Sequence, residues 1–413
     1  MNNQKLKGTR KLHVCLLISG ILAPISGTST AAQVAPPNQL RVFLLDGNRL
    51  LAARAAIRKG DKILELALER LRRDAQKALA IEPQSVMSKQ ATPPSGSKHD
   101  YMSQAPYFWP NPKTADHLPY IRRDGERNPE INKISDHQSM DRMVSAVETL
   151  ALAYFFDGDE KFAAKAAELL RVWFVDPATR MNPNLEYAQF IPGVNTGRGI
   201  GLIETRGMTR LVDAIGLLAG SRAWNELDQK NLEQWFSSFL QWMLTSKNGR
   251  DEAAAKNNHG TYYDLQVSSF ALFLGRKDLA IATLESARLK RIAIQIEPDG
   301  RQPLELVRTK GWSYSVGNLD GLTLLAILGE RVRVDLFSYR TADGRGIRTA
   351  LDYLVPFALG EKKWPDQQIG EWQPEILVPL IRRGSARYRD SRYEELIKKI
   401  APVDASDRSN LIY

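Results

Sequence analysis

Two short stretches of this chain concentrate side chains that can bind a carboxylate and move a proton. Residues 256–264 read KNNHGTYYD and hold two amides, an imidazole and two phenols. Residues 305–314 read ELVRTKGWSY and add a guanidinium and a further phenol. Amides and imidazoles can donate hydrogen bonds to a carboxylate, and a phenol can exchange a proton beside them. These stretches therefore predict a site that holds a sugar carboxylate and moves a proton next to it.

The segments that must position these residues read as helices. Apolar residues recur at helical spacing from residue 40 onward, as in Leu64, Leu68 and Leu71. Two irregular stretches, residues 81–135 and 178–201, interrupt the pattern, and the first is rich in proline. Helices are predicted at residues 40–58, 61–80, 143–154, 162–173, 203–218, 232–243, 262–274, 279–296, 304–315, 319–327, 347–359, 375–381 and 393–400.

The arrangement of these helices indicates the fold class. Many turns between them are short, as between antiparallel neighbours, and no strand longer than a few residues is predicted. Successive helical hairpins are typical of a solenoid or of a closed ring, and the absence of a strict sequence repeat favours the ring. We predict an all-α, single-domain (α/α) toroid, an incomplete α/α barrel of about six or seven helical hairpins, over residues 33–413.

The N-terminus has the features of a secretory signal peptide. Four basic residues within residues 5–11 precede a mostly apolar run, residues 12–25, that is too short to span a bilayer. Small residues follow, so we expect cleavage after Ala32. The single cysteine, Cys15, lies in this segment, and the mature chain is expected to lack disulfides. We predict a signal peptide over residues 1–32, export to the periplasm or the medium, and no stable membrane insertion after cleavage.

The charge indicates the kind of partner. The chain has 57 basic and 47 acidic residues, a net charge of +10. Removing residues 1–32 takes away four basic residues and leaves 53 against 47, or +6. This balance suits a polyanion, but no zinc-finger spacing, RNA-binding signature or basic block indicates nucleic acid. For an exported protein we expect an acidic polysaccharide as partner and no nucleic acid.

The two stretches resemble the α/α-toroid alginate lyases and their relatives that act on other polyuronates. Residues 105–112, APYFWPNP, residues 118–125, LPYIRRDG, and residues 201–206, GLIETR, are similar to segments of the same family. The similarity runs from about residue 100 to about residue 380. It implies that Asn258, His259, Arg308 and Tyr314 are the catalytic residues. The spacing of six between Arg308 and Tyr314 occurs in family members of which some act on mannuronate polymers and others on glucuronate polymers. The resemblance therefore does not decide which sugar is the substrate.

β-Elimination needs these residue types together. The C5 proton of a uronate is weakly acidic, and donors to its carboxylate, here Asn258 and His259, stabilise the charge that develops as the proton leaves. Tyr314 is expected to be the base, and the guanidinium of Arg308 would favour its phenolate. A spacing of six would place these two residues on different faces of an unbroken helix, so we expect Gly311 to interrupt it.

Stereochemistry links the base to the substrate. In mannuronate and glucuronate the C5 proton and the C4 oxygen lie on one face, so a single tyrosine can take the first and protonate the second. In guluronate they lie on opposite faces, and His259 would supply the second group. The one evident phenol, Tyr314, favours a substrate of the first kind.

Other interpretations of these residues compete with catalysis. Asn258 is also a common type of helix N-cap, and Arg308 also has Glu305 as a possible partner. Four further residues are expected to contact the substrate, either by stacking on its sugar rings or by binding its carboxylates: Tyr107, Trp109, Arg206 and Tyr262. Of the adjacent phenols at positions 262 and 263, one is expected in the cleft and one in the core.

Two other protein classes stay open. An inverting glycoside hydrolase acting on acidic oligosaccharides would need two carboxylates, and the candidates are Asp264, Asp320, Asp366 and Glu371. A non-catalytic protein that binds acidic glycans would not require the catalytic set.

A metal site is not expected. Its candidate ligands are His99, Asp100, His117, Asp136 and His137, whose spacing matches no metal-binding template. Amides can neutralise the carboxylate without a metal, so we predict no metal and no cofactor.

Overall fold

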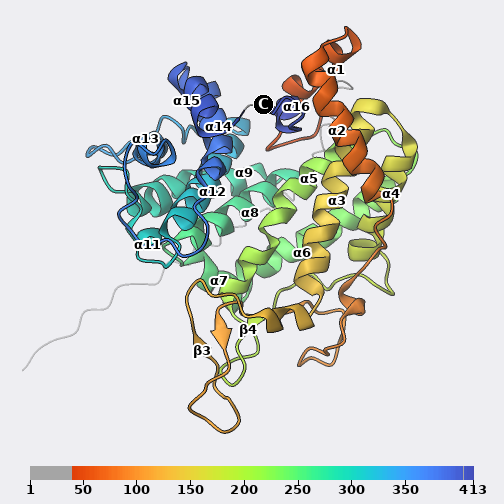
Figure 1. Cartoon of the computed structure of the whole chain (residues 1–413). Helices are drawn as coiled ribbons and strands as arrows, with labels where there is room; N and C mark the ends of the chain where they lie inside the picture. Colours follow the sequence, from red (N-terminus) through yellow and green to blue (C-terminus); the bar gives the residue numbers. More distant parts are fainter. Residues whose placement is uncertain (1–39, 403) are drawn as a thin grey trace, which may run out of the picture. The chain divides into compact units, whose positions relative to one another are not determined.

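Helices make up most of residues 40–402 and 404–413, the part of the chain that the computed structural model describes (Figure 1). The longer helices are α1 (Gly47–Arg58), α2 (Lys62–Ala78), α3 (Asp136–Asp157), α4 (Glu160–Leu170), α5 (Met208–Leu217), α6 (Glu226–Thr245), α8 (Asn258–Phe273), α9 (Lys277–Ala287), α12 (Gly311–Arg331), α13 (Ile347–Ala358), α14 (Val378–Tyr388) and α15 (Arg392–Ile400). Shorter helices are α7 (Lys247–Ala253), α10 (Ala293–Gln295), α11 (Pro303–Leu306) and α16 (Ser409–Ile412). The predicted signal peptide, residues 1–32 with Cys15, lies outside the described residues.

Short polar turns end one helix and start the next. Helix α3 ends at Gly158, whose φ of 71° is the left-handed conformation that glycine adopts without strain. The next residue, Asp159, accepts a hydrogen bond from the backbone of Lys161 and caps α4. These two residues turn the chain through a hairpin, and α3 packs along α4. Helical hairpins of this kind recur, as predicted for most of the chain.

Helices α8 and α12 form the buried centre and pack against each other. Nearly all residues of α8 from Gly260 to Phe273 are buried. Gly321 of α12 permits the close approach, because a Cβ atom there would lie 2.9 Å from Thr261 Cγ2 of α8. The aromatic side chains of Phe236 and Phe270 extend this core toward α6, with ring centroids 5.1 Å apart. These contacts fix α8 against α12 and α6.

One predicted helix is broken in the structure. The prediction of a helix over residues 304–315 is wrong, because α11 ends at Leu306 and α12 begins at Gly311. The segment between them bonds to residues 367–369 instead: Gly311 N donates to Gln367 O at 2.9 Å, and Ile369 N donates to Thr309 O at 2.8 Å. The expected interruption at Gly311 is therefore present. Helix α12 then runs without a break through the helix predicted at 319–327.

The irregular stretch at residues 81–135 is held by short strands and buried polar contacts. Strand β1 (Met102–Gln104) pairs in parallel with β4 (Tyr187–Phe190), and β2 (Phe108–Trp109) pairs antiparallel with β3 (Ile121–Arg122). We call residues 106–127, which contain β2 and β3, the arm. In Figure 1, β3 and β4 lie at the bottom of the view, away from α1 and α15.

No helix in the described part of the chain combines the length and the apolar character needed to cross a membrane.

Candidate active site

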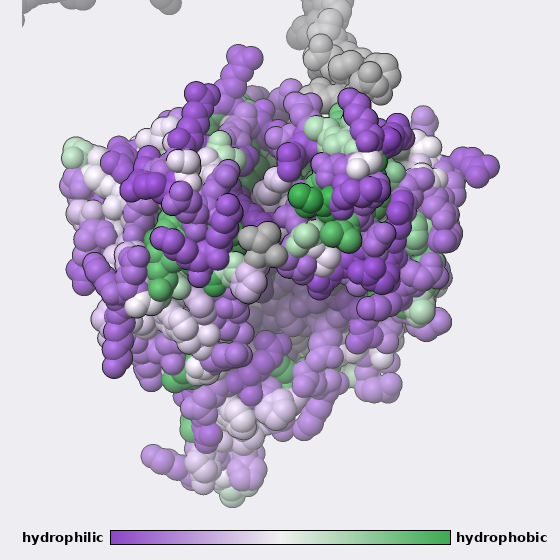
Figure 2. Space-filling view, turned by 45° about the horizontal axis from the view of Figure 1, so that its top comes forward, coloured by the Kyte–Doolittle hydropathy of each residue, from purple (hydrophilic) through white to green (hydrophobic). Residues whose placement is uncertain are grey.

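The arm, the 3-10 helix at Gly199–Gly207 and the starts of α8 and α12 surround a cavity of about 620 Å³, which we call the cleft. All four predicted catalytic residues line it. A second cavity, of about 580 Å³, shares Glu204, Arg206 and Tyr262 with the cleft and extends to Tyr413. Figure 2, with the α1 and α15 end turned forward, shows a largely hydrophilic face that is hollowed near its middle.

Asn258 is fixed by a buried carboxylate. It is the first residue of α8, so the cap position belongs to Asn257, whose side chain makes no capping bond. The Asn258 backbone N donates to Glu305 Oε1 and its Nδ2 to Glu305 Oε2, both at 2.7 Å. Burial raises the pKa of Glu305, and the two bonds from Asn258 oppose that rise. One N–H of the Asn258 amide remains available to a ligand in the cleft.

His259 is fixed in the same way. Its Nδ1 lies 2.8 Å from Oε1 of Glu252, a residue of α7 that is only 2% exposed. The other Glu252 oxygen, Oε2, has no hydrogen-bond partner among the described residues. With Nδ1 engaged by a carboxylate, Nε2 is the ring atom left for a ligand. Asn258, His259, Glu252 and Glu305 form what we call the helical side of the cleft.

Arg308 and Tyr314 meet because they lie on either side of the start of α12. Arg308 Nη2 donates to the Tyr314 hydroxyl at 2.9 Å, and its Cζ lies 4.0 Å from the centroid of the Tyr314 ring. The Tyr314 hydroxyl is also 2.9 Å from the Tyr107 hydroxyl. Burial, reinforced by the bond to Tyr107, raises the pKa of Tyr314 far above its ordinary value, although Arg308 lowers it. Arg308 therefore favours the phenolate as expected, but the effect of burial on the pKa of Tyr314 is larger.

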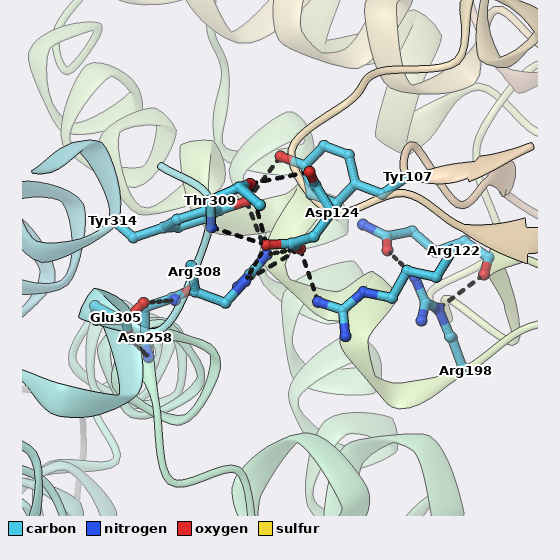
Figure 3. Close-up of polar contacts among 10 residues, drawn as sticks. Tyr107, Arg122, Asp124, Arg198, Asn258, Glu305, Arg308, Thr309 and Tyr314 are labelled. Atoms are coloured by element: carbon cyan, nitrogen blue, oxygen red, sulfur yellow. Dashed lines mark hydrogen bonds and ion pairs between the residues drawn. The ribbon is translucent and has the colours of Figure 1, made fainter. Parts of the chain in front are cut away.

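Arg308 is held by the arm. Its Nε and Nη2 both donate to the carboxylate of Asp124, at 2.8 to 3.2 Å, and Thr309 N donates to the same group (Figure 3). Burial alone would raise the pKa of Asp124, but hydrogen bonds from Arg308, Thr309 and Arg122 hold it well below its usual range. The alternative partner considered for Arg308, Glu305, binds Asn258 instead. Tyr107, Asp124, Arg308 and Tyr314 form what we call the arm side.

The predicted substrate-binding residues separate into two groups. Tyr107, Arg206 and Tyr262 line the cleft. Tyr262 donates its hydroxyl proton to Gly317 O, whereas the adjacent Tyr263 is buried against Met243 O, so one of the two phenols faces the cleft as expected. Trp109 does not line it. Its Nε1 donates to Glu126 O and Arg123 covers its ring, which places the indole within the arm.

The carboxylates considered for a hydrolase lie outside the cleft lining. Asp264 is buried in an ion pair with Arg291, at 2.7 Å, and Asp320 pairs with Arg383 at 2.6 Å. Carboxylates neutralised in this way are poorly placed to flank a glycosidic bond.

The candidate metal ligands have other partners. Asp100 accepts hydrogen bonds from Ser95 and Asn182, and Asp136 forms a buried ion pair with Lys89 at 2.9 Å. Among residues 40–402 and 404–413, no group of three or more His, Cys, Asp or Glu side chains could hold a metal ion.

The supporting roles of three residues of the site were not predicted from the sequence. Glu252 and Glu305 lie behind the catalytic pair, and Asp124 comes from a distant loop. Glu252 precedes His259 by only seven residues and Glu305 precedes Arg308 by three, so proximity to the motifs was an available signal. Asp124 lies inside the LPYIRRDG segment, but nothing in that segment indicates what it contacts.

The chain is similar to known alginate lyases in sequence and in structure. The family model described as alginate lyase matches residues 85–364. The structure is similar to the crystal structure of an alginate lyase from Bacteroides ovatus, with a TM-score of 0.87 and 40% sequence identity over 91% of this chain and 99% of that chain. No curated protein matches the chain.

More distant structures extend the likeness in fold. Alginate lyase A1-III from Sphingomonas species A1 has a TM-score of 0.59 at 15% identity, over 91% of this chain and 97% of that chain. A variant of alginate lyase A1-III complexed with a tetrasaccharide has a TM-score of 0.60 at 16% identity, over 91% and 96%. The predicted all-α (α/α) toroid is confirmed. Because the family model covers well over half of the sequence, and a relative 40% identical matches along nearly its whole length, the chain belongs to the alginate lyase family and is a polysaccharide lyase.

Proposed function

We propose that this enzyme cleaves a polyuronate by syn β-elimination, with polymannuronate in alginate as the first expected substrate and glucuronan as the second. The observation that carries the proposal is the meeting of Tyr314, Arg308, Asn258 and His259 around one cleft. The name of the 40% identical relative, an alginate lyase, supports the choice of polymer.

The helical side would neutralise the substrate carboxylate. Asn258 has a free amide N–H and His259 a free Nε2, and both are fixed from behind by buried carboxylates. Donors that are already oriented stabilise developing charge without reorganising during the reaction. As the C5 proton leaves, negative charge spreads into the uronate carboxylate, where these two residues would bind it.

The arm side would move the proton. Tyr314 would take the C5 proton, the C5–H electron pair would form the C4=C5 double bond, and the C4–O4 bond would break. Tyr314 would then return the proton to O4, which leaves a new reducing end and an unsaturated uronate. Since burial raises the pKa of Tyr314, the phenol must first lose its own proton. The Tyr107 hydroxyl, at 2.9 Å, would relay it by accepting this proton while passing its own to solvent in the cleft. Arg308 would stabilise the resulting phenolate.

An ultraviolet assay on polymannuronate, polyguluronate and glucuronan in parallel tests this function. The unsaturated product absorbs in the ultraviolet, and the fastest rise is expected on polymannuronate. A preference for polyguluronate would contradict a syn mechanism that uses one tyrosine. Cleavage without ultraviolet absorbance would contradict elimination altogether.

We also propose that the enzyme is exported, to the periplasm or the medium, after removal of residues 1–32. The basic, apolar and small-residue segments of this stretch support the proposal. The mass of the protein recovered from its native compartment tests it, and a mass that includes residues 1–32 would contradict it.

A further inference from the structure

Arg198 is a cation on the wall of the cleft that has no carboxylate partner. Across residues 40–402 and 404–413, no carboxylate oxygen lies within ion-pair distance of its guanidinium, although it lines the cleft. Arg308 and Arg122, by contrast, share Asp124. Burial lowers the pKa of Arg198 to about 10, with Glu204 and Glu252 opposing the fall and Arg122 adding to it, so the side chain is still charged at neutral pH. A half-buried charge that no carboxylate contacts directly is costly, and binding of an anion would lower that cost.

Its side chain is held in one orientation by neutral groups. Nε donates to Gln189 O at 3.1 Å, and Nη2 donates to Gln189 Oε1 at 2.9 Å. The guanidinium also lies over the Phe108 ring, with Cζ 5.1 Å from the centroid. Gln189 has a φ of 49°, a left-handed conformation that costs free energy for a residue with a side chain. Backbone strain of this kind is concentrated at ligand-binding sites.

The backbone around Arg198 is equally constrained. A Cβ atom on Gly197 would lie 1.9 Å from Glu186 O, and one on Gly199 would lie 2.6 Å from Asn248 O. Arg198 N donates to Ala188 O at 3.1 Å between these two close approaches. Only glycines fit on either side, so the arginine is presented by a rigid support. Its Nη1 has no hydrogen-bond partner among the described residues, which leaves that edge available to the cleft.

We propose that Arg198 binds the carboxylate of a uronate residue next to the one that is cleaved. The proposal rests on the proposed function, because it assumes that the bound polymer carries a carboxylate on successive rings. Figure 3 places Asn258, Arg308 and Tyr314 on one side of Asp124 and Arg198 on the other, so the two carboxylate sites are separate. Two such sites select for consecutive uronates, whereas a single site would accept an isolated uronate in a neutral chain.

Calorimetric titration with tetramannuronate tests the assignment. The Tyr314→Phe protein, which is expected not to turn over, is compared with the same protein carrying Arg198→Met. A hydrogen-bonded charge pair contributes enough that its loss should weaken tetramannuronate binding by about ten- to a hundredfold. Neutral β-(1→4)-linked mannotetraose has the same rings without carboxylates, and its affinity should be equal in the two proteins.

Arg142→Met is the matched control, because Arg142 is an exposed arginine of α3 that lies outside the cleft lining and has no hydrogen bond or aromatic contact among the described residues. It should weaken binding by less than about threefold, as expected for a loss of bulk charge. An equal effect of the two substitutions would overturn the proposal, and so would an unchanged affinity in the Arg198→Met protein.

Folding and turnover are controlled separately. Arg198→Lys keeps the charge but loses the planar fork, and it should bind tetramannuronate several-fold more weakly than arginine while melting near the parent temperature. If Arg198→Met does not fold, full affinity in Arg198→Lys would sink the assignment. Ultraviolet absorbance recorded on the same samples detects residual turnover by Tyr314→Phe, which would count against the proposed function and not against Arg198.

Discussion

The two sides of the cleft hold their reactive groups by different means. On the helical side, Asn258 and His259 rest on carboxylates, Glu305 and Glu252, that are 1% and 2% exposed. These contacts join neighbouring helices of the ring and are closed to water.

On the arm side, the supporting groups come from a loop. Tyr107 contacts Tyr314, and Asp124 contacts Arg308. The side chains of Asp124 and Arg308 are 19% and 15% exposed. The donors that stabilise charge are thus built into the fold, whereas the group that moves the proton depends on the arm. The difference separates the two tasks of the enzyme, so variants on each side should fail in different ways.

The largest effect is expected from Tyr314→Phe. Phenylalanine keeps the ring but has no proton to exchange, and because one group would serve as base and acid, the rate should fall by about ten-thousandfold or more while binding persists. His259→Ala should lose about a hundred- to a thousandfold, because it removes one oriented donor. Initial ultraviolet rates on polymannuronate measure both.

The order of these two losses is decisive. If Tyr314→Phe retains more activity than His259→Ala, Tyr314 is not the base, and preference should move toward guluronate. Tyr353→Phe, a half-buried tyrosine outside the cleft lining, is the matched control and should be fully active.

The rate should also increase with pH. Burial raises the pKa of Tyr314, so the phenol is protonated at neutral pH and its reactive, ionised fraction grows by about tenfold per pH unit below that pKa. We expect kcat/KM on polymannuronate to rise more than about tenfold from pH 6 to pH 9. A flat profile over this range would show that ionisation of Tyr314 does not limit the reaction.

Glu305→Gln tests the helical side. The substitution replaces one of the two Glu305 oxygens that accept hydrogen bonds from Asn258 with an NH2 group. This NH2 group faces an N–H donor of Asn258, and the repulsion between two donors displaces the Asn258 side chain. We expect a loss of about a hundredfold in kcat/KM together with a lower melting temperature, because the change is buried. Glu226→Gln, on the exposed first turn of α6, should change neither quantity, and full activity of Glu305→Gln would refute a positioning role for this carboxylate.

Asp124→Asn tests the arm side and should have the smallest effect of these substitutions. The amide removes the charge and one of the acceptors that orient Arg308, so Tyr314 loses part of its support. We expect kcat/KM to fall by about tenfold with little change in melting temperature, since the pair is partly exposed. Asp116→Asn on the same arm is the control. A loss as large as that of Glu305→Gln would remove the distinction between the two sides.

Much of the fold was predictable because helical periodicity is local. Helices α2, α3 and α6 follow from apolar residues three and four positions apart, and turn residues such as Gly158 mark where they end. The interruption at Gly311 was expected only from the need to bring Arg308 and Tyr314 together, and the helical pattern over residues 304–315 does not show it, because the break depends on hydrogen bonds to residues 367–369. Periodicity within one segment contains no information about such a partner.

The site was predictable in its reactive groups and not in their supports. The types and spacing of Asn258, His259, Arg308 and Tyr314 indicate their chemistry directly, and they meet in the cleft. Their catalytic roles stay predictions. Trp109 was expected to contact the substrate, but it does not line the cleft, and its Nε1 donates to Glu126 O within the arm.

The contacts of the arm have a consequence for folding kinetics. Asp124 and Arg308 are 184 residues apart in sequence, and Tyr107 and Tyr314 are 207 apart. Closing loops of this length is slow compared with forming adjacent helices, because the chain loses conformational entropy before the contacts are made. Refolding from denaturant should therefore restore the helical circular dichroism signal before it restores activity, and the delay between the two signals would measure how late the arm joins α12.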